Sequence, residues 1–205
     1  MTLISHPPFK SGKTSTLVFV ARLLAARGKR VLITSYTHSA VDNVVIKLME
    51  SGLNAADERT GLPPLARVVG DKKACHPGVR SVVVSELAIA LDRIEARRES
   101  TSSGMAKFGS QEDVEETILP SARSLRKAIS SARIVCTTAL SVPRSPLLNG
   151  EEFDTVIVDE AGQISQPAVL GALMAADSFV LVGDHLQLPP LVNSELAEQG
   201  GKAMS

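Results

Sequence analysis

The sequence predicts an α/β fold in which helices cover a parallel β-sheet. Short apolar runs of the kind found in buried parallel strands alternate with segments that repeat apolar residues at helical spacing. The chain has 205 residues, of which 44% are hydrophobic, enough for one domain with a sizeable core and an insertion. We therefore expect a single folded unit built on one sheet.

The composition excludes several classes of site. The formal net charge is zero, from 22 basic and 22 acidic side chains, so any surface for nucleic acid must be local. Aromatic residues make up 3% of the chain, which disfavours a platform of stacked rings. Cys75 and Cys136 lie far apart, which argues against a zinc or iron–sulfur site and suits a reducing compartment. Without a long apolar run or a signal-peptide pattern, we expect a soluble intracellular chain.

The first quarter of the chain alternates strands and helices. Residues 2–5 are expected to form a short strand, and the loop that follows leads into a segment with helical spacing that Gly28 caps. A strand is then expected at 31–33 and a helix at 38–50. This order of elements is typical of a parallel sheet.

The middle of the chain is expected to be a mainly helical inserted subdomain at residues 53–130. We predict a strand at 68–69 and helices at 82–98 and 112–129. Between the helices, residues 99–113 are rich in Ser, Gly and charge, and they are expected to form a flexible loop.

The regular pattern returns after the insertion. A helix is expected at 166–176, with Pro167 tolerated in its first turn. Three further strands are predicted, at 134–136, 156–158 and 179–182. The core of the fold then comprises residues 1–52 and 131–205.

The stretch SGKT at residues 11–14 matches the second half of the phosphate-binding loop G-x-x-x-x-G-K-[ST]. Gly12 allows close approach of the backbone to a phosphate, Lys13 can reach the β- and γ-phosphates, and the Thr14 hydroxyl can ligate magnesium. The match alone leaves an ordinary helix start open. Pro7 stands where the loop should have its first glycine; it fixes φ and offers no N–H, so we expect weakened binding of phosphate. Residues 1–10 that are foreign to the native protein would give the same pattern.

Two further motifs follow predicted strands. In FDTVIVDEAGQ, Asp159 and Glu160 stand at the carboxyl end of a strand, where ligands bind in open α/β sheets. One carboxylate can hold magnesium while its neighbour orients or deprotonates water, although an ordinary acidic turn remains open. In VLVGDHLQLPP, Gln187 can donate to a γ-phosphate oxygen, although a solvated loop residue is the simpler reading. Three such motifs in this order favour a nucleotide site.

These motifs together resemble a known family. SGKT, SYTHSAVDN, VDEAGQISQP and GDHLQLPPLV look like motifs I, Ia, II and III of superfamily 1 helicases, in the five-prime to three-prime branch. Within that branch, the chain is similar to the first motor lobe of the helicase/nuclease family that acts in eukaryotic DNA replication. The similarity is dense over 31–48 and 154–192 and thin through the insertion.

The resemblance implies a RecA-like P-loop NTPase fold that uses ATP and Mg²⁺, and it assigns roles to matching positions. It implies a catalytic set with Glu160 as the base, made up of Glu160, Asp159, Lys13 and Gln187. It implies magnesium ligation by Thr14 and Asp159, and ATP contact by Ser11, Gly12, Lys13, Thr14, Ser15 and Gln187. Nucleic-acid contact is implied for Thr37, His38, Thr137 and Thr138. The position of Thr37 equally suits a helix N-cap.

The implied function is ATP-driven translocation on single-stranded DNA, in replication and repair in the nucleus. The second motor lobe with its arginine finger and the nuclease domain are expected outside this chain, so we expect negligible hydrolysis by this chain alone. Three alternatives stay open: an RNA helicase of the nonsense-mediated-decay type, a decayed non-catalytic fragment that binds nucleic acid or a partner, and an unrelated phosphate-loop ATPase.

Overall fold

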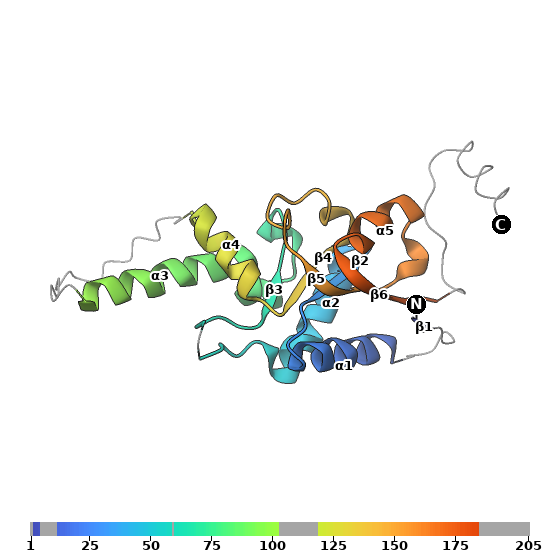
Figure 1. The fold of residues 1–205 in the computed structure, drawn as a ribbon, viewed down its shortest axis with the longest axis horizontal. Helices are drawn as coiled ribbons and strands as arrows, with labels where there is room; N and C mark the ends of the chain where they lie inside the picture. Colours follow the sequence, from blue (N-terminus) through green and yellow to red (C-terminus); the bar gives the residue numbers. More distant parts are fainter. Residues whose placement is uncertain (1, 5–11, 59, 103–118, 185–205) are drawn as a thin grey trace.

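The sheet has six strands, all parallel, in the order β1-β6-β5-β2-β4-β3 (Figure 1). This is seen in a computed structural model that describes residues 2–4, 12–58, 60–102 and 119–184. The strands are β1 (Thr2–Ile4), β2 (Val31–Ser35), β3 (Leu65–Arg67), β4 (Ile134–Thr138), β5 (Phe153–Val158) and β6 (Ala176–Val182). The predicted α/β fold with a parallel sheet is confirmed.

Helices cover both faces of the sheet. They are α1 (Lys13–Ala26), α2 (His38–Leu48), α3 (Val84–Ser102), α4 (Ala122–Ser131) and α5 (Gln166–Leu173). Neighbouring residues of β2 point to opposite faces: Ile33 packs in the core beneath α1 and α2, and Leu32 packs in the core beneath α3, α4 and α5. In Figure 1, α1 lies on one side of the sheet and α5 on the other. This burial on both faces explains why the strands read as continuous apolar runs.

Five short helical turns complete the described part of the chain. They are η1 (Met49–Leu53), η2 (Lys72–Ala74), η3 (Pro77–Val82), η4 (Ala139–Ser141) and η5 (Ala161–Gln163). Within the described ranges, no helix is long and apolar enough to cross a membrane.

Several predicted boundaries were wrong. The α-helix predicted at 38–50 ends at Leu48 and passes into the π-turn η1, where Gly52 has a φ of 93°. The strand predicted at 68–69 lies three positions earlier, because Leu65 to Arg67 pair with β4. The helix predicted at 166–176 ends at Leu173, and Ala176 already belongs to β6.

The helical pair of the predicted insertion also differs in its limits. Residues 99–102 continue α3 instead of starting a loop, and residues 103–118 lie outside the described part. Helix α4 begins only at Ala122, because the side chain of Ser121 caps it by accepting from the backbone N–H of Ser124 at 3.0 Å. Asp92 on α3 accepts from the backbone N–H of Ser121 at 3.3 Å, which ties the two helices together. The extent of the insertion, 53–130, stays a prediction.

Candidate nucleotide and nucleic-acid site

The predicted phosphate-binding and acidic residues meet at the C-terminal edge of the sheet. All strands are parallel, so the segments after β1, β5 and β6 leave the sheet on the same side. Gly12 caps α1 with a φ of 64°, which favours glycine, and it has no side chain that could cap the helix. The first N–H groups of a helix attract anions, so the start of α1 suits a phosphate. Thr14 and Ser15 lie in this first turn, whereas Ser11, Pro7 and Gln187 lie outside the described residues.

Lys13 forms an ion pair that the sequence did not reveal. Its Nζ lies 2.9 Å from Oδ2 of Asp184, whose side chain is 1% exposed, at the end of β6. The two residues are 171 positions apart in the chain, and spacing alone cannot show that their side chains meet.

Asp159 and Glu160 form a pair of carboxylates beside Lys13. Asp159 is buried; its N–H donates to the carbonyl of Thr34 at 2.8 Å, and its Oδ1 accepts from the N–H of Glu160 at 3.0 Å. Burial raises the pKa of Asp159, and the nearby charges of Lys13 and Lys47 oppose this. Burial, followed by the charge of Asp159, raises the pKa of Glu160. A buried carboxylate beside a partly buried one favours a cation.

The backbone at Glu160 is strained. Its φ is 53°, and no other non-glycine residue in the described part of the chain has a positive φ. A left-handed conformation costs about 1–2 kcal/mol for an L-residue. Such strain collects at functional sites, and here it sets the direction in which the carboxylate of Glu160 leaves the end of β5.

The side chains at this edge fit magnesium bound together with a nucleotide. Mg²⁺ prefers oxygen ligands and takes one or two carboxylates, with phosphates and water completing its shell. Thr14 and Asp159 supply a hydroxyl and a carboxylate of this kind. Across the described ranges, no three His, Cys, Asp or Glu side chains gather as a metal site, so a metal held by protein ligands alone is not indicated.

We expect Asp159→Asn to stabilise the chain at neutral pH without nucleotide. The folded-state pKa of Asp159 lies above its ordinary value of 3.8, so its contribution to stability is present below that value and is lost as pH rises through the raised pKa. Removing the charge of one buried carboxylate that its surroundings compensate poorly should raise the free energy of unfolding by about 1–2 kcal/mol. Thermal unfolding at pH 7.5 should show a higher midpoint, and this gain should shrink as pH falls toward 4. The exposed Asp177→Asn is the control, and a gain independent of pH would contradict the prediction.

The predicted nucleic-acid residues lie at the same edge: Thr37 and His38 follow β2, and Thr137 and Thr138 are the last two residues of β4. The exposed Thr37 caps α2, its Oγ1 accepting from the N–H of Ala40 at 3.1 Å, so its helix-capping role is confirmed. Thr137 has no exposed surface and donates to the carbonyl of Val68 at 3.1 Å, so its side chain cannot reach a ligand in this conformation. Thr138 is 6% exposed and bonds Ser141 at 2.7 Å. Nucleic-acid contact by these residues and by His38 stays a prediction.

A buried charge network lies directly beneath this surface. Arg67 at the end of β3 has no exposed side-chain area, and its Nε donates to Oδ1 of Asp42 on α2 at 2.9 Å. Its two other nitrogens contact the carbonyl of Val68 at 2.7 Å and Nδ1 of His38 at 3.0 Å. Neither Arg67 nor Asp42 was predicted from the sequence as part of a site. The sequence did contain a signal for this network, because an arginine inside a buried strand needs an acidic or hydrogen-bonding partner.

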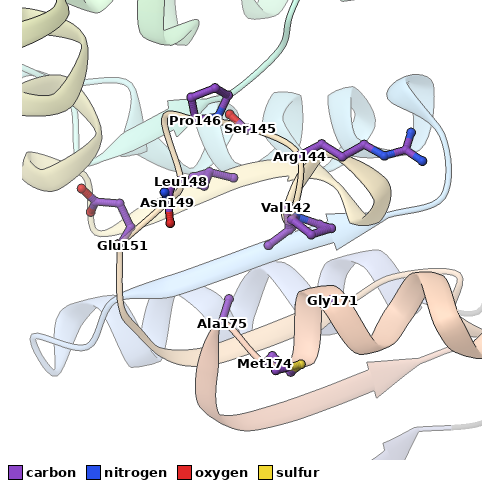
Figure 2. Close-up of a pocket in the computed structure, with 12 residues that line it drawn as sticks. Val142, Arg144, Ser145, Pro146, Leu148, Asn149, Glu151, Gly171, Met174 and Ala175 are labelled. Atoms are coloured by element: carbon purple, nitrogen blue, oxygen red, sulfur yellow. The ribbon is translucent and has the colours of Figure 1, made fainter.

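Two of the cavities lined by described residues lie beside the segment that follows β4, apart from Lys13 and the acidic pair. The larger, about 530 Å³, is bounded by the segment after β4 and by α5, and Figure 2 shows Val142 and Leu148 facing it from one side and Met174 and Ala175 from the other. A second hollow of about 410 Å³ lies at the ends of β3 and β4 and includes Ser141. None of the predicted site residues lines either cavity.

This fold and site define a class. A parallel sheet with Gly-Lys-Thr at the start of α1, and paired carboxylates at the end of β5, is the arrangement of a RecA-like P-loop NTPase. The chain belongs to the AAA domain family, whose model matches residues 1–113 and 90–195.

Curated relatives are DNA replication helicase/nucleases. The chain is 37% identical over 195 residues to the DNA replication ATP-dependent helicase/nuclease JHS1 of Arabidopsis thaliana, covering 95% of this chain and 12% of that protein. It is 37% and 36% identical over 204 residues to the DNA replication ATP-dependent helicase/nuclease DNA2 of Xenopus laevis and of Homo sapiens, covering all of this chain and 16% of each. The chain therefore spans about one sixth or less of these relatives. The predicted membership of the helicase family is confirmed.

Proposed function

We propose that this chain is the ATP-binding first motor lobe of a DNA helicase/nuclease that acts in DNA replication and repair in the nucleus. Together with a second lobe, it couples ATP hydrolysis to movement along single-stranded DNA. The observation that carries the proposal is the meeting of Lys13, Asp159 and Glu160 at one edge of the sheet, with Thr37 and His38 at the same edge. The names of the relatives, as DNA replication helicase/nucleases, support DNA as the substrate.

Each residue has a distinct task in this proposal. The first N–H groups of α1 and the ammonium of Lys13 bind the phosphates of ATP. Thr14 and Asp159 would hold Mg²⁺, which would neutralise charge on the phosphates. Glu160 orients a water molecule and accepts its proton as the water oxygen attacks the γ-phosphorus; the bond from that phosphorus to the β–γ bridging oxygen breaks, and ADP leaves. Its raised pKa makes it a stronger base than an ordinary glutamate.

The ion pair between Lys13 and Asp184 offers a link between ATP binding and the segment after β6. Binding of phosphate draws Lys13 away from Asp184, which stands three residues before Gln187. Gln187 then senses the γ-phosphate, as the family motif predicts. Its position lies outside the described residues, so this role rests on the sequence.

Lys13→Ala is expected to abolish saturable binding of a slowly hydrolysed ATP analogue with Mg²⁺, because a neutral side chain cannot balance the phosphate charge. Isothermal titration calorimetry measures the binding. Lys29→Ala is the matched control: Lys29 also contacts an aspartate, Asp154 at 2.7 Å, but it is exposed and precedes β2 at the opposite edge of the sheet. Equal binding by wild type and Lys13→Ala would contradict the nucleotide site.

A non-catalytic role remains the second candidate, because Pro7 departs from the phosphate-loop pattern. If wild-type protein binds no nucleotide and still binds single-stranded DNA, this candidate is favoured. Parallel titrations with DNA and RNA of one sequence test the RNA-helicase alternative, since a site that uses the 2′-hydroxyl prefers RNA.

A further inference from the structure

A chain of three side chains runs from the interior to the surface beside Thr37. Asp42 is held at both oxygens, by Nε of Arg67 at 2.9 Å and by the N–H of His76 at 2.7 Å. Arg67 is fixed in turn by its contact with the carbonyl of Val68, and it reaches outward to Nδ1 of His38 at 3.0 Å. Because every member is anchored, the position of the imidazole of His38 is set from inside the protein.

The chemistry of Arg67 decides where the proton of His38 resides. A guanidinium has donors only and stays charged, so Nδ1 of His38 must be the acceptor. The neutral ring then carries its proton on Nε2. The charged groups that face His38 are Arg67 on β3 and Asp42 on α2; burial and then the charge of Arg67 lower the pKa of His38, and Asp42 opposes them. His38 therefore stays neutral at physiological pH.

We propose that Arg67 is a positioning residue that presents His38 as an uncharged Nε2–H donor to a phosphodiester oxygen of single-stranded DNA. The inference rests on the proposed function and deepens it. His38 begins α2 next to the exposed Thr37, and the described residues supply no hydrogen-bond partner to its Nε2. Phosphate oxygens are the acceptors most often met by side chains at such positions.

A neutral hydrogen-bond donor and a charged one affect the salt dependence of DNA binding differently. A residue that neutralises a phosphate lowers the salt dependence of DNA binding when it is removed, because it releases a counterion. Removal of the His38 donor should instead lower affinity equally at all salt concentrations. Affinity should also not rise between pH 7.5 and pH 6, as it would if the imidazole became charged.

Two substitutions of His38 test the roles of Nδ1 and Nε2 separately. In His38→Asn, the side-chain oxygen can replace Nδ1 and accept from Arg67, but nothing reaches the place of Nε2. In His38→Gln, the longer amide can place a donor there. We expect His38→Asn to weaken binding of a fluorescent oligodeoxynucleotide about fivefold with an unchanged salt slope, and His38→Gln to stay within about twofold of wild type. The control is the other described histidine, as His76→Asn, since asparagine can also cap η3.

Two further measurements keep the proposal falsifiable. Nitrogen chemical shifts of His38 in wild type should report a proton on Nε2, and a proton on Nδ1 would overturn the inference. Arg67→Gln should free the imidazole, so that affinity rises as pH falls from 7.5 to 6, and a flat profile in a folded Arg67→Gln variant would overturn it.

The outcomes also distinguish this inference from the function on which it rests. If wild type binds no single-stranded DNA, the proposed function fails. If wild type binds DNA and His38→Asn binds equally well, only the role of Arg67 and His38 fails.

Discussion

Glu160→Gln is expected to lower ATP hydrolysis about 100- to 10,000-fold, the range usual for loss of a general base. Glutamine keeps the size and the polar contacts of the side chain but cannot accept a proton from water. Nucleotide binding should be retained or strengthened, because the repulsion between Glu160 and Asp159 disappears. Since we expect slow turnover from this chain alone, single-turnover assays with protein in excess over labelled ATP provide the measurement.

A matched control lies at the other end of the same strand. Glu152 is exposed and stands just before β5, at the other edge of the sheet. Glu152→Gln should therefore hydrolyse ATP like wild type. Equal rates for Glu160→Gln and wild type would exclude Glu160 as the base, and loss of ATP binding in Glu160→Gln would indicate a damaged site instead.

Asp42→Ala is expected to destabilise the chain by about 3–5 kcal/mol, the range for removing one partner of a buried ion pair. The substitution leaves the fully buried guanidinium of Arg67 without its carboxylate and the N–H of His76 without its acceptor. Urea unfolding measures the change. Glu86→Ala, which breaks an exposed pair with Lys72, should change the free energy of unfolding by about 1 kcal/mol or less.

A double variant tests why Asp42→Ala loses stability. Replacing both partners with apolar residues, as in Asp42→Leu with Arg67→Met, removes the unpaired buried charge and should recover part of the stability. If the double variant is as unstable as the sum of its single variants, packing and not charge explains the effect.

The sheet and the motif positions could be predicted from the sequence because they depend on local patterns. Runs such as 31–33 and 156–158 are apolar on both faces, and only a strand in a covered parallel sheet hides both. Given a parallel sheet, residues that follow its strands must share one edge, which brings Lys13, Asp159 and Glu160 together. Boundaries were less accurate, because pairing decides them: β3 stops at Arg67 where its ladder with β4 ends.

Contacts between distant segments could not be predicted. Nothing in the spacing shows that Asp184 reaches Lys13, or that Arg67 joins Asp42 to His38. The same is true of Thr137, whose motif suggests a surface role although its hydroxyl lies in the interior.

By itself, the sequence determined the α/β class, the order of most strands and helices along the chain, and the residue types that are suited to phosphate and magnesium. Each depends on a periodicity or a motif that a few neighbouring residues define. Only the tertiary structure decided which carboxylate holds Lys13, which threonine is buried, and which ring nitrogen of His38 faces outward. Those properties depend on distances between segments remote in sequence and on how far water is excluded from their side chains. Both are fixed only once the chain has packed.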